Sequence, residues 1–351
     1  KSDRRATWGG DGVARASFGL TLTNRAVVLG VIKASDLIEI TQAAEASGAF
    51  DAVWAGDSLL AKPRLESVTL LSALAGATSR VRLGVGCLAT FVHRHPVLFA
   101  HQWASLDVLS NGRTWLAVCL GGPDEAGKAQ ALEHSAMSIR SSERIARLEE
   151  GIEILRKLFH EKNVSHHGRF YQFDGVTIQP QPIQNPCPIW IASNPTGLTW
   201  KGGASASEAV VERGLRRVAR FADGWMTNKL SPDEFSKQWA RVTAMAREEG
   251  RDPSRLGSAL YHNININEDR QAALEESKKF LDTYYTSNFS AAFVEGWTVA
   301  GSPKECVEQI RAYVDAGLGH LALRLTSWDQ KGQLRRFLDE VAPAFVGKRA
   351  A

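Results

Sequence analysis

Apolar residues along this chain follow two alternating patterns. In the first, short runs rich in Val, Ile, Leu and Trp lie between Gly, Pro, Asn or Asp residues, which is typical of buried β-strands. In the second, apolar residues recur every three or four positions, as they do from Ile145 to Phe159, so that they share one face of a helix. Strands that alternate with helices in this way predict a parallel sheet with crossover helices.

Eight of the apolar runs are predicted to be strands. Eight strand–helix units in 351 residues favour a (β/α)8 barrel over an open doubly wound sheet, and no G-x-G-x-x-G follows the first run. We therefore expect an α/β protein with one (β/α)8 TIM-barrel domain over residues 17–345 and an N-terminal extension over residues 1–16. The predicted strands are Ser17–Leu22, Ala52–Ala55, Val81–Gly86, Arg113–Leu120, Pro188–Ala192, Gly224–Thr227, Ala259–Ile266 and His320–Leu325.

Two predicted helices carry start signals. Each begins with Ser-Pro followed by a Glu that can complete a capping box, at Ser231 to Glu234 and at Ser302 to Glu305. Gly317 is expected to end the second of these helices in a left-handed conformation.

Three segments interrupt the alternation. Lys162–Gln184 is predicted to hold an inserted hairpin, because Val164–His166 and Phe170–Phe173 flank a His-Gly-Arg turn. Gly121–Ser141 and Ser193–Ser207 each follow a predicted strand, and long loops in a compact domain usually carry function or disorder. Because ligands bind at the carboxyl ends of strands in α/β folds, we expect these two segments to cover the site.

Composition and charge disfavour several classes of partner. The 42 basic residues are dispersed among 38 acidic ones and leave a formal net charge of +4, which gives little support for nucleic-acid binding. The longest apolar runs, such as Ala26–Ile32, are far shorter than the ~20 residues that span a bilayer, and residues 1–15 lack the apolar centre of a signal peptide. We expect a cytoplasmic protein that binds neither nucleic acid nor membrane.

The reactive side chains narrow the chemistry further. Cys87, Cys119, Cys187 and Cys306 form no C-x-x-C pair, which favours reduced thiols over a disulfide framework, and no metal site is predicted. The chain has no G-x-S-x-G, H-E-x-x-H or P-loop motif, so serine hydrolase, zincin and P-loop nucleotide chemistry find no support.

Candidate site residues follow the second and third predicted strands. Asp57 can hydrogen-bond a ligand or a neighbouring loop, or it can simply cap the next turn. At Gly86-Cys87, a ligand contact and a simple turn are equally compatible with the sequence. His95 directly precedes a proline, which favours a structural role at a helix start, whereas His93 is freer to point into a site.

A loop of small and polar residues follows the fifth predicted strand. Its amides and hydroxyls can cradle a phosphate, and a polar loop without a ligand explains the same residues equally well. The residues concerned are Ser193, Asn194, Thr196 and Gly197.

In combination, segments spread from Phe18 to Phe345 match one family pattern. They are Phe50–Trp54 with Gly56-Asp57, Thr78–Gly84, His95–Val97, Leu106–Arg113, Ser142–Phe159, Pro188–Ser193, Arg220–Trp225, Gly301–Pro303 and Gly317–His320. Together they resemble the bacterial luciferase-like (LLM class) flavin-dependent oxidoreductases, a family of (β/α)8 barrels.

This resemblance implies a flavin or deazaflavin cofactor at the carboxyl ends of the strands. In the family, the isoalloxazine ring lies on a non-prolyl cis peptide after the third strand, and by position that peptide is Gly86-Cys87. The loop after the fifth strand resembles the family's phosphate-binding segment. Asp57 stands where members place a polar residue that faces the cofactor.

Two branches of the family imply two reactions. One branch adds O2 to reduced flavin mononucleotide (FMN) and oxidises a small organic substrate, whereas the coenzyme F420 branch transfers a hydride without oxygen. The F420-dependent sugar-phosphate dehydrogenases carry a His after the strand-two aspartate and a Gly-Glu after strand four, where this chain has Ser58 and Gly122. This departure favours an FMN-dependent monooxygenase, with an F420-dependent oxidoreductase as the alternative.

The monooxygenase hypothesis implies several partners. They are a small organic substrate, O2 and a separate flavin reductase, and the family also implies a homodimer or a higher homo-oligomer. A third hypothesis is a flavin-binding relative without catalytic activity. The candidate catalytic residues are polar groups at or near the carboxyl ends of predicted strands, namely His93, Asn228, His262 and Arg324.

Overall fold

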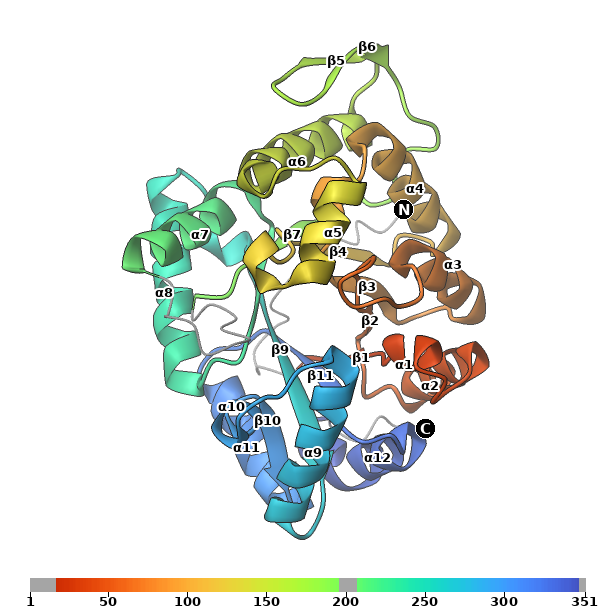
Figure 1. Ribbon diagram of the computed structural model, residues 1–351, viewed down its shortest axis with the longest axis vertical. Helices are drawn as coiled ribbons and strands as arrows, with labels where there is room; N and C mark the ends of the chain where they lie inside the picture. The colour runs from red at the N-terminus through yellow and green to blue at the C-terminus, as the bar shows by residue number, and fades with distance from the viewer. Residues whose placement is uncertain (1–16, 196–206, 347–351) are drawn as a thin grey trace. The chain divides into compact units, whose positions relative to one another are not determined.

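The computed structural model describes residues 17–195 and 207–346, which form two compact units. The N-terminal unit consists of Thr21–Ala46 and Ala52–Ala192. The C-terminal unit consists of the described residues from 193 onward together with residues 17–20 and 47–51. Strands and helices alternate within each unit, as the apolar pattern predicts (Figure 1).

Four parallel strands form the sheet of the N-terminal unit. They are β2 (Ala52–Ala55), β3 (Arg82–Leu88), β4 (Thr114–Val118) and β7 (Ile189–Ala192), and each pairs with the next in that order. The helices are α1 (Arg25–Val28), α2 (Ala34–Ser47), α3 (Ser67–Ala77), α4 (Pro96–Leu109), α5 (Lys128–Ala136) and α6 (Arg144–His160), with short turns η1 (Phe91–His93), η2 (Asp124–Ala126) and η3 (Ser141–Glu143).

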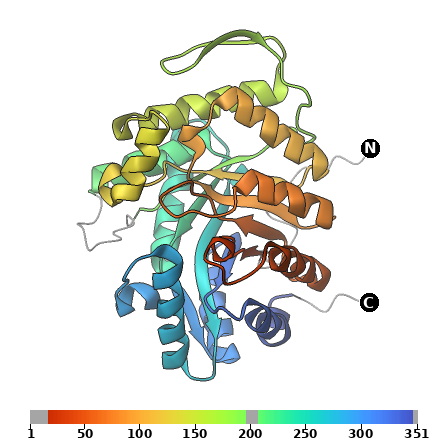
Figure 2. The ribbon, with the colours of Figure 1, turned by 45° about the vertical axis from the view of Figure 1, so that its right-hand side comes forward.

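The predicted inserted hairpin is confirmed. Its strands β5 (Val164–His167) and β6 (Gln172–Val176) pair antiparallel. The hairpin stands out beyond α6 in both ribbon views (Figure 2).

The long strand β9 (Gly257–Ile266) organises the C-terminal unit. It runs parallel to β8 (Gly224–Asn228), β10 (Thr298–Gly301) and β11 (His320–Leu325), and β11 also pairs with β1 (Ser17–Thr21). The helices are α7 (Glu208–Phe221), α8 (Pro232–Glu248), α9 (Arg270–Tyr285), α10 (Ala291–Glu295), α11 (Pro303–Asp315) and α12 (Gln330–Arg336), with short helical turns η4 (Pro253–Arg255), η5 (Phe337–Val341) and η6 (Ala342–Ala344). Within residues 17–195 and 207–346, no helix is both long and apolar enough to cross a membrane.

All eight predicted strands are present, with ends shifted by at most two residues. The sequence reading missed β10, a fully buried strand of four residues. Its run is only four residues long, and Gly296 alone marks the turn that precedes it. Both predicted capping boxes are also confirmed, and Gly317 has the left-handed φ of 85° expected after α11.

Buried tryptophans cover one face of the N-terminal sheet. The strand register places Gly84 beside both Trp54 and Trp115, and the rings of these two tryptophans lie 4.8 Å apart. Trp190 extends the row at 4.9 Å from Trp115. A Cβ on Gly84 would lie 2.3 Å from the ring of Trp54, so only glycine leaves room for this packing.

A buried carboxylate ties α4 to the sheet. Oδ1 of Asp107 accepts hydrogen bonds from the hydroxyl of Thr114 (2.6 Å) and the side-chain amide of Gln184 (2.7 Å). Its Oδ2 accepts from the backbone amides of Ile183 (2.7 Å) and Gln184 (3.0 Å). This fully buried acid is therefore satisfied by four donors, as burial of a charged group requires.

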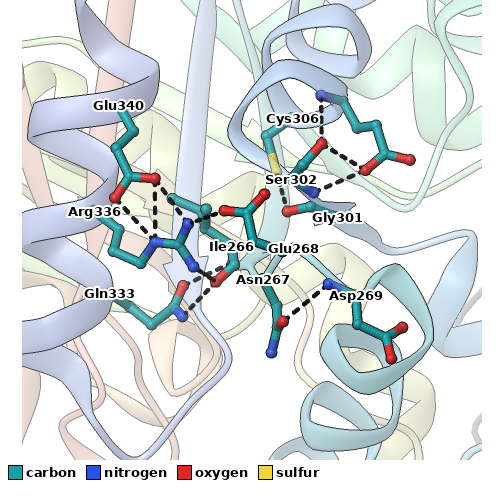
Figure 3. A network of polar contacts seen from close by, with 11 residues as sticks. Ile266, Asn267, Glu268, Asp269, Gly301, Ser302, Cys306, Gln333, Arg336 and Glu340 are labelled. Atoms are coloured by element: carbon teal, nitrogen blue, oxygen red, sulfur yellow. Dashed lines mark hydrogen bonds and ion pairs between the residues drawn. The ribbon is translucent and has the colours of Figure 1, made fainter.

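Arg336 fixes the carboxyl end of β9 in the C-terminal unit (Figure 3). Its Nη1 donates to the carbonyl of Ile266 (3.0 Å), which also accepts from Gln333 (3.0 Å). Its Nη2 and Nε donate to the carboxylates of Glu268 (2.7 Å) and Glu340 (3.0 Å). One guanidinium therefore joins α12 and η5 to the end of β9.

Gly84→Ala is expected to lower the free energy of unfolding by about 1–3 kcal/mol, because the new Cβ must displace the buried ring of Trp54. Gly76→Ala is the matched control in the same unit. Gly76 lies in α3 with no atom within 4 Å of an added Cβ, so alanine should raise the free energy of unfolding by up to about 1 kcal/mol. Urea unfolding measures both, and equal effects would contradict the proposed packing.

Candidate active site

Partly exposed residues lie near the carboxyl end of β3 and directly after β4. Residues 83–85 are buried, whereas Gly86 and Cys87 are partly exposed. On the neighbouring strand, Val118 is buried and residues 119–122 are partly exposed. The Gly86-Cys87 peptide is cis, as the resemblance implies.

The side chain of Cys87 is held as the protonated thiol. Its hydrogen bond with Cys119, together with burial, raises the pKa of Cys87 well above its ordinary value. Both cysteines are free. At neutral pH the end of β3 therefore presents a small, uncharged thiol beside Gly86.

Asp57 joins the end of β2 to two neighbouring segments. Its carboxylate accepts hydrogen bonds from the hydroxyl of Ser67, the first residue of α3 (2.9 Å), and from the backbone amide of Thr90 (2.7 Å). The guanidinium of Arg94 lies 3.8 Å away. Of the roles that the sequence allows, the bond to a neighbouring loop is present, and contact with a cofactor stays a prediction.

His93 lies in the turn that Asp57 holds. Its side chain is 1% exposed, and its Nδ1 lies 3.6 Å from Oε1 of Glu133. Among the residues that the structure describes, neither ring nitrogen has a hydrogen-bond partner. Burial lowers the pKa of His93, and the nearby Glu133 carboxylate opposes this effect. At neutral pH this neutral ring can therefore accept a proton.

Helix α5 supplies the groups beside His93. The carboxylate of Glu133 accepts hydrogen bonds from the backbone amides of Leu60 (2.7 Å) and Ala61 (3.0 Å), which fix its position. The ring of His134 lies 5.3 Å from that of His93, and its Nδ1 lies 2.5 Å from a carboxylate oxygen of Asp124. The sequence reading missed Glu133 and His134. Their only signal was a Glu-His pair inside Gly121–Ser141, the segment expected to cover the site.

His95 has the position expected of a helix start. It is the N-cap residue of α4, with Pro96 in the first turn, although its side chain makes no capping hydrogen bond. Its ring packs edge-on against Tyr171 at 5.4 Å. The structural role that the sequence favours is therefore confirmed.

In the C-terminal unit, the start of the predicted phosphate loop lies beside β8. The side-chain amide of Asn194 donates to that of Asn228 (2.5 Å). The backbone of Ser193 bonds to Met226 (3.0 Å) and accepts from the indole of Trp225 (2.8 Å). Two further predicted loop residues, Thr196 and Gly197, lie outside the described residues.

Arg324 of β11 lies in a cage of tyrosines. Its Nη1 donates to the hydroxyl of Tyr285 (2.6 Å), and its guanidinium lies 4.5 Å and 5.0 Å from the ring centres of Tyr284 and Tyr261. Burial raises the pKa of Tyr261 well above its ordinary value, so this hydroxyl is neutral. Aromatic faces thus stabilise a buried cation that forms no ion pair among the described residues.

His262 lies on the opposite face of β9 from Tyr261, because side chains alternate along a strand. Its ring packs beside Tyr313 of α11 at 5.3 Å. Burial lowers the pKa of His262 to about 3, so it is neutral at physiological pH. Arg324 and His262 were both predicted to be catalytic. The structure places Arg324 beside Tyr261 and His262 on the other face of β9.

Comparison with known proteins identifies related sequences and folds. A family model described as luciferase-like monooxygenase matches residues 16–199 and 206–320. An F420-dependent glucose-6-phosphate dehydrogenase from Amycolatopsis mediterranei is 28% identical over 333 residues, which cover 88% of this chain and 93% of that relative.

Two solved structures share the fold. A monooxygenase from Streptomyces bottropensis matches with a TM-score of 0.76 and 22% identity, over 94% of this chain and all of that one. An F420-dependent secondary alcohol dehydrogenase in complex with an F420–acetone adduct matches with a TM-score of 0.75 and 17% identity, over 95% and 99% of the two chains. The predicted fold class, a luciferase-like (β/α)8 barrel, is confirmed.

The pKa of His93 is expected to lie below that of an ordinary histidine, and Glu133→Gln is expected to lower it further because the mutation removes the charge that stabilises the imidazolium. NMR titration of the ring Cε1–H signals of labelled histidines measures both values. Asp174→Asn, beside the exposed His167, is the matched control and should leave the pKa of His93 unchanged. A rise in the pKa of His93 on removal of the Glu133 charge would contradict this electrostatic coupling.

Proposed function

The chain belongs to the luciferase-like monooxygenase family and is an oxidoreductase; on this premise, we propose that it uses coenzyme F420 to transfer a hydride to or from a small organic substrate. The observation that carries this proposal is the match to an F420-dependent dehydrogenase over most of both chains. An F420-dependent alcohol dehydrogenase that shares the fold adds support.

This proposal reverses the order of the two hypotheses drawn from the sequence. The departures at Ser58 and Gly122 favoured reduced FMN as the cofactor, whereas the comparisons favour F420. O2 and a separate flavin reductase belong to the monooxygenase hypothesis. The relative that matches in sequence over most of both chains is F420-dependent, so neither is part of the proposal.

The same two positions disfavour glucose 6-phosphate as the substrate. Ser58 is bonded to its own loop, where its hydroxyl accepts the backbone amide of Lys62 (2.9 Å). At Gly122 a Cβ would lie 2.9 Å from Oε1 of Gln130, so a glutamate would fit here only if Gln130 moved. We therefore propose a different small alcohol or carbonyl compound as the substrate.

The residues present fit a planar cofactor ring and a phosphate group. In the N-terminal unit, Gly86 and Cys87 offer small, uncharged and partly exposed groups that suit the face of an aromatic ring. The carboxylate of Asp57 lies near enough to Cys87 to contribute to its raised pKa. In the C-terminal unit, Ser193 and Asn194 offer hydroxyl and amide groups that suit a phosphate. We propose these residues, with Thr196 and Gly197, as cofactor contacts.

When bound, F420 supplies the carbon that accepts or donates the hydride. Oxidation of an alcohol also requires a group that removes the hydroxyl proton. We assign this role to His93, which is neutral and free to accept a proton, with Glu133 placed to stabilise the imidazolium that forms. Asn228 and Arg324 stay candidates for contacts with the substrate.

Purified protein is expected to reduce F420 with a small alcohol under strictly anaerobic conditions. A panel of secondary alcohols, with glucose 6-phosphate included, measured by loss of the visible absorption of oxidised F420, tests this expectation. Turnover that requires both reduced FMN and O2, and that fails with F420, would restore the monooxygenase hypothesis.

His93→Asn is expected to lower kcat by about 10²–10⁴-fold while the affinity for F420 stays unchanged, because the mutation removes a proton acceptor and not a cofactor contact. Glu133→Gln should lower kcat less, because it removes only the charge that stabilises the imidazolium and leaves the proton acceptor in place. Steady-state kinetics with the best alcohol measures both, with His167→Asn as the exposed control.

The pH profile of Glu133→Gln follows from the pKa of His93. A base must be unprotonated to act, so activity falls as the pH drops through its pKa. Glu133→Gln lowers this pKa, and the acid limb of the kcat profile is therefore expected to move to lower pH. An unchanged kcat in His93→Asn would remove His93 from the mechanism without affecting the choice of cofactor.

A further inference from the structure

Cationic side chains gather at the carboxyl end of β2 in the N-terminal unit. Arg64 lies in the loop from β2 to α3, and its Nη1 is so near Gly56 that a Cβ on this glycine would be 2.2 Å away. Nε of Arg64 donates to the carbonyl of Lys62 in the same loop (3.2 Å). Lys62 and Arg64 are both partly exposed, so a ligand from solvent can reach them.

A third cation comes from the segment after β1. Nδ2 of Asn24 donates to the carbonyl of Gly56 (2.8 Å), which holds this segment against the end of β2. The next residue, Arg25, is buried, with 7% of its surface exposed. Burial, together with the charges of Arg64 and Arg25, lowers the pKa of Lys62 to about 8. We call Arg25, Lys62 and Arg64 the cationic cluster.

The carboxylate of Glu133 connects the cationic cluster with His93. It opposes the lowering of the Lys62 pKa, and its Oε1 lies 3.6 Å from Nδ1 of His93. Its Oε2 accepts hydrogen bonds from the amides of Leu60 and Ala61. Within the described ranges, two guanidinium groups and one ammonium thus converge beside this carboxylate, close to the candidate proton acceptor.

The charges of the cationic cluster suit a carboxylate as the ligand. Like charges that converge repel one another, and a bound anion relieves this repulsion. A carboxylate can accept two parallel hydrogen bonds from a guanidinium and a further one from an ammonium. A phosphate dianion suits the cluster less well, because Glu133 already neutralises part of its charge and would repel the second negative charge.

We propose that the substrate is a small hydroxy acid, or the corresponding oxo acid, whose carboxylate binds Lys62 and Arg64, with Arg25 adding positive charge from below the surface. This inference rests on the proposed function and names its substrate class. In the oxidation, the C–H and O–H bonds of the alcohol group break and a C=O bond forms. The hydride goes to F420 and the proton goes to His93.

Lactate is the probe, and lactamide is its uncharged isostere. Without any cofactor, saturating lactate is expected to raise the pKa of Lys62 above the value of about 8 in the free protein, because a bound carboxylate stabilises the ammonium. NMR titration of protein with labelled lysines measures this pKa, and Lys62→Gln identifies the signal by its loss. An unchanged pKa with lactate, or an equal rise with lactamide, would overturn the proposal.

Lys62→Gln is expected to weaken lactate binding by about tenfold or more, because it removes a charge-assisted hydrogen bond. Lys157→Gln is the matched control: Lys157 pairs with Glu153 on α6 (2.7 Å), and its loss should change the affinity by less than about twofold. Calorimetric titration measures both. Equal affinities of Lys62→Gln and the wild type would overturn the proposal, as would tighter binding of inorganic phosphate than of lactate.

Gly56→Ala moves the guanidinium of Arg64 without removing a charge. Because the new Cβ meets the flexible end of that side chain, the midpoint of thermal unfolding should stay close to that of the wild type while lactate binding weakens severalfold. Arg64→Gln tests the same contact by removing the charge. Wild-type affinity for lactate in both variants would overturn the assignment of Arg64.

Anaerobic turnover with F420 separates this inference from the proposed function. The kcat/KM for lactate is expected to exceed that for isopropanol by at least about tenfold, and Lys62→Gln should raise KM more than it lowers kcat. Lactate binding without F420 turnover of any alcohol would overturn the proposed function and support the carboxylate site. Turnover of isopropanol as efficient as that of lactate would overturn the carboxylate site and support the proposed function.

Discussion

The buried carboxylate of Asp57 is the interaction on which the candidate catalytic group depends. It accepts hydrogen bonds from the amide of Thr90 and the hydroxyl of Ser67. These bonds connect the turn that contains His93 with the end of β2 and the start of α3. Glu133 of α5 lies beside His93, and its carboxylate is held in place by hydrogen bonds from the backbone amides of Leu60 and Ala61. Two acids thus position one histidine, and the proposed proton transfer relies on that arrangement.

Burial also sets the charge state of the functional groups. His93 and His262 are held neutral, and the thiol of Cys87 is held protonated. Arg324 keeps its charge among tyrosine rings and hydroxyls. The proposed hydride transfer would benefit from such control, because the polar groups could then be placed without excess charge beside the proposed aromatic cofactor.

The sequence predicts the strands well because each is a continuous apolar run between turn residues, as at Ala52–Ala55 and His320–Leu325. The family resemblance and the cis peptide at Gly86-Cys87 are also confirmed. Glu133, Tyr284 and Tyr285 were missed because their roles arise from helices whose rotation against the sheet is set by packing and not by local pattern. The comparisons favour the reverse order of the two cofactor hypotheses. Ser58 and Gly122 were weighed as evidence about the cofactor, and we propose that they bear more directly on the substrate.

The most direct test of this account is calorimetric titration of the wild-type protein with F420 and, anaerobically, with reduced FMN. The account predicts saturable binding of F420 with an affinity at least about tenfold higher than that for reduced FMN, a difference of about 1.4 kcal/mol or more. Tight binding of reduced FMN without detectable binding of F420 would contradict it.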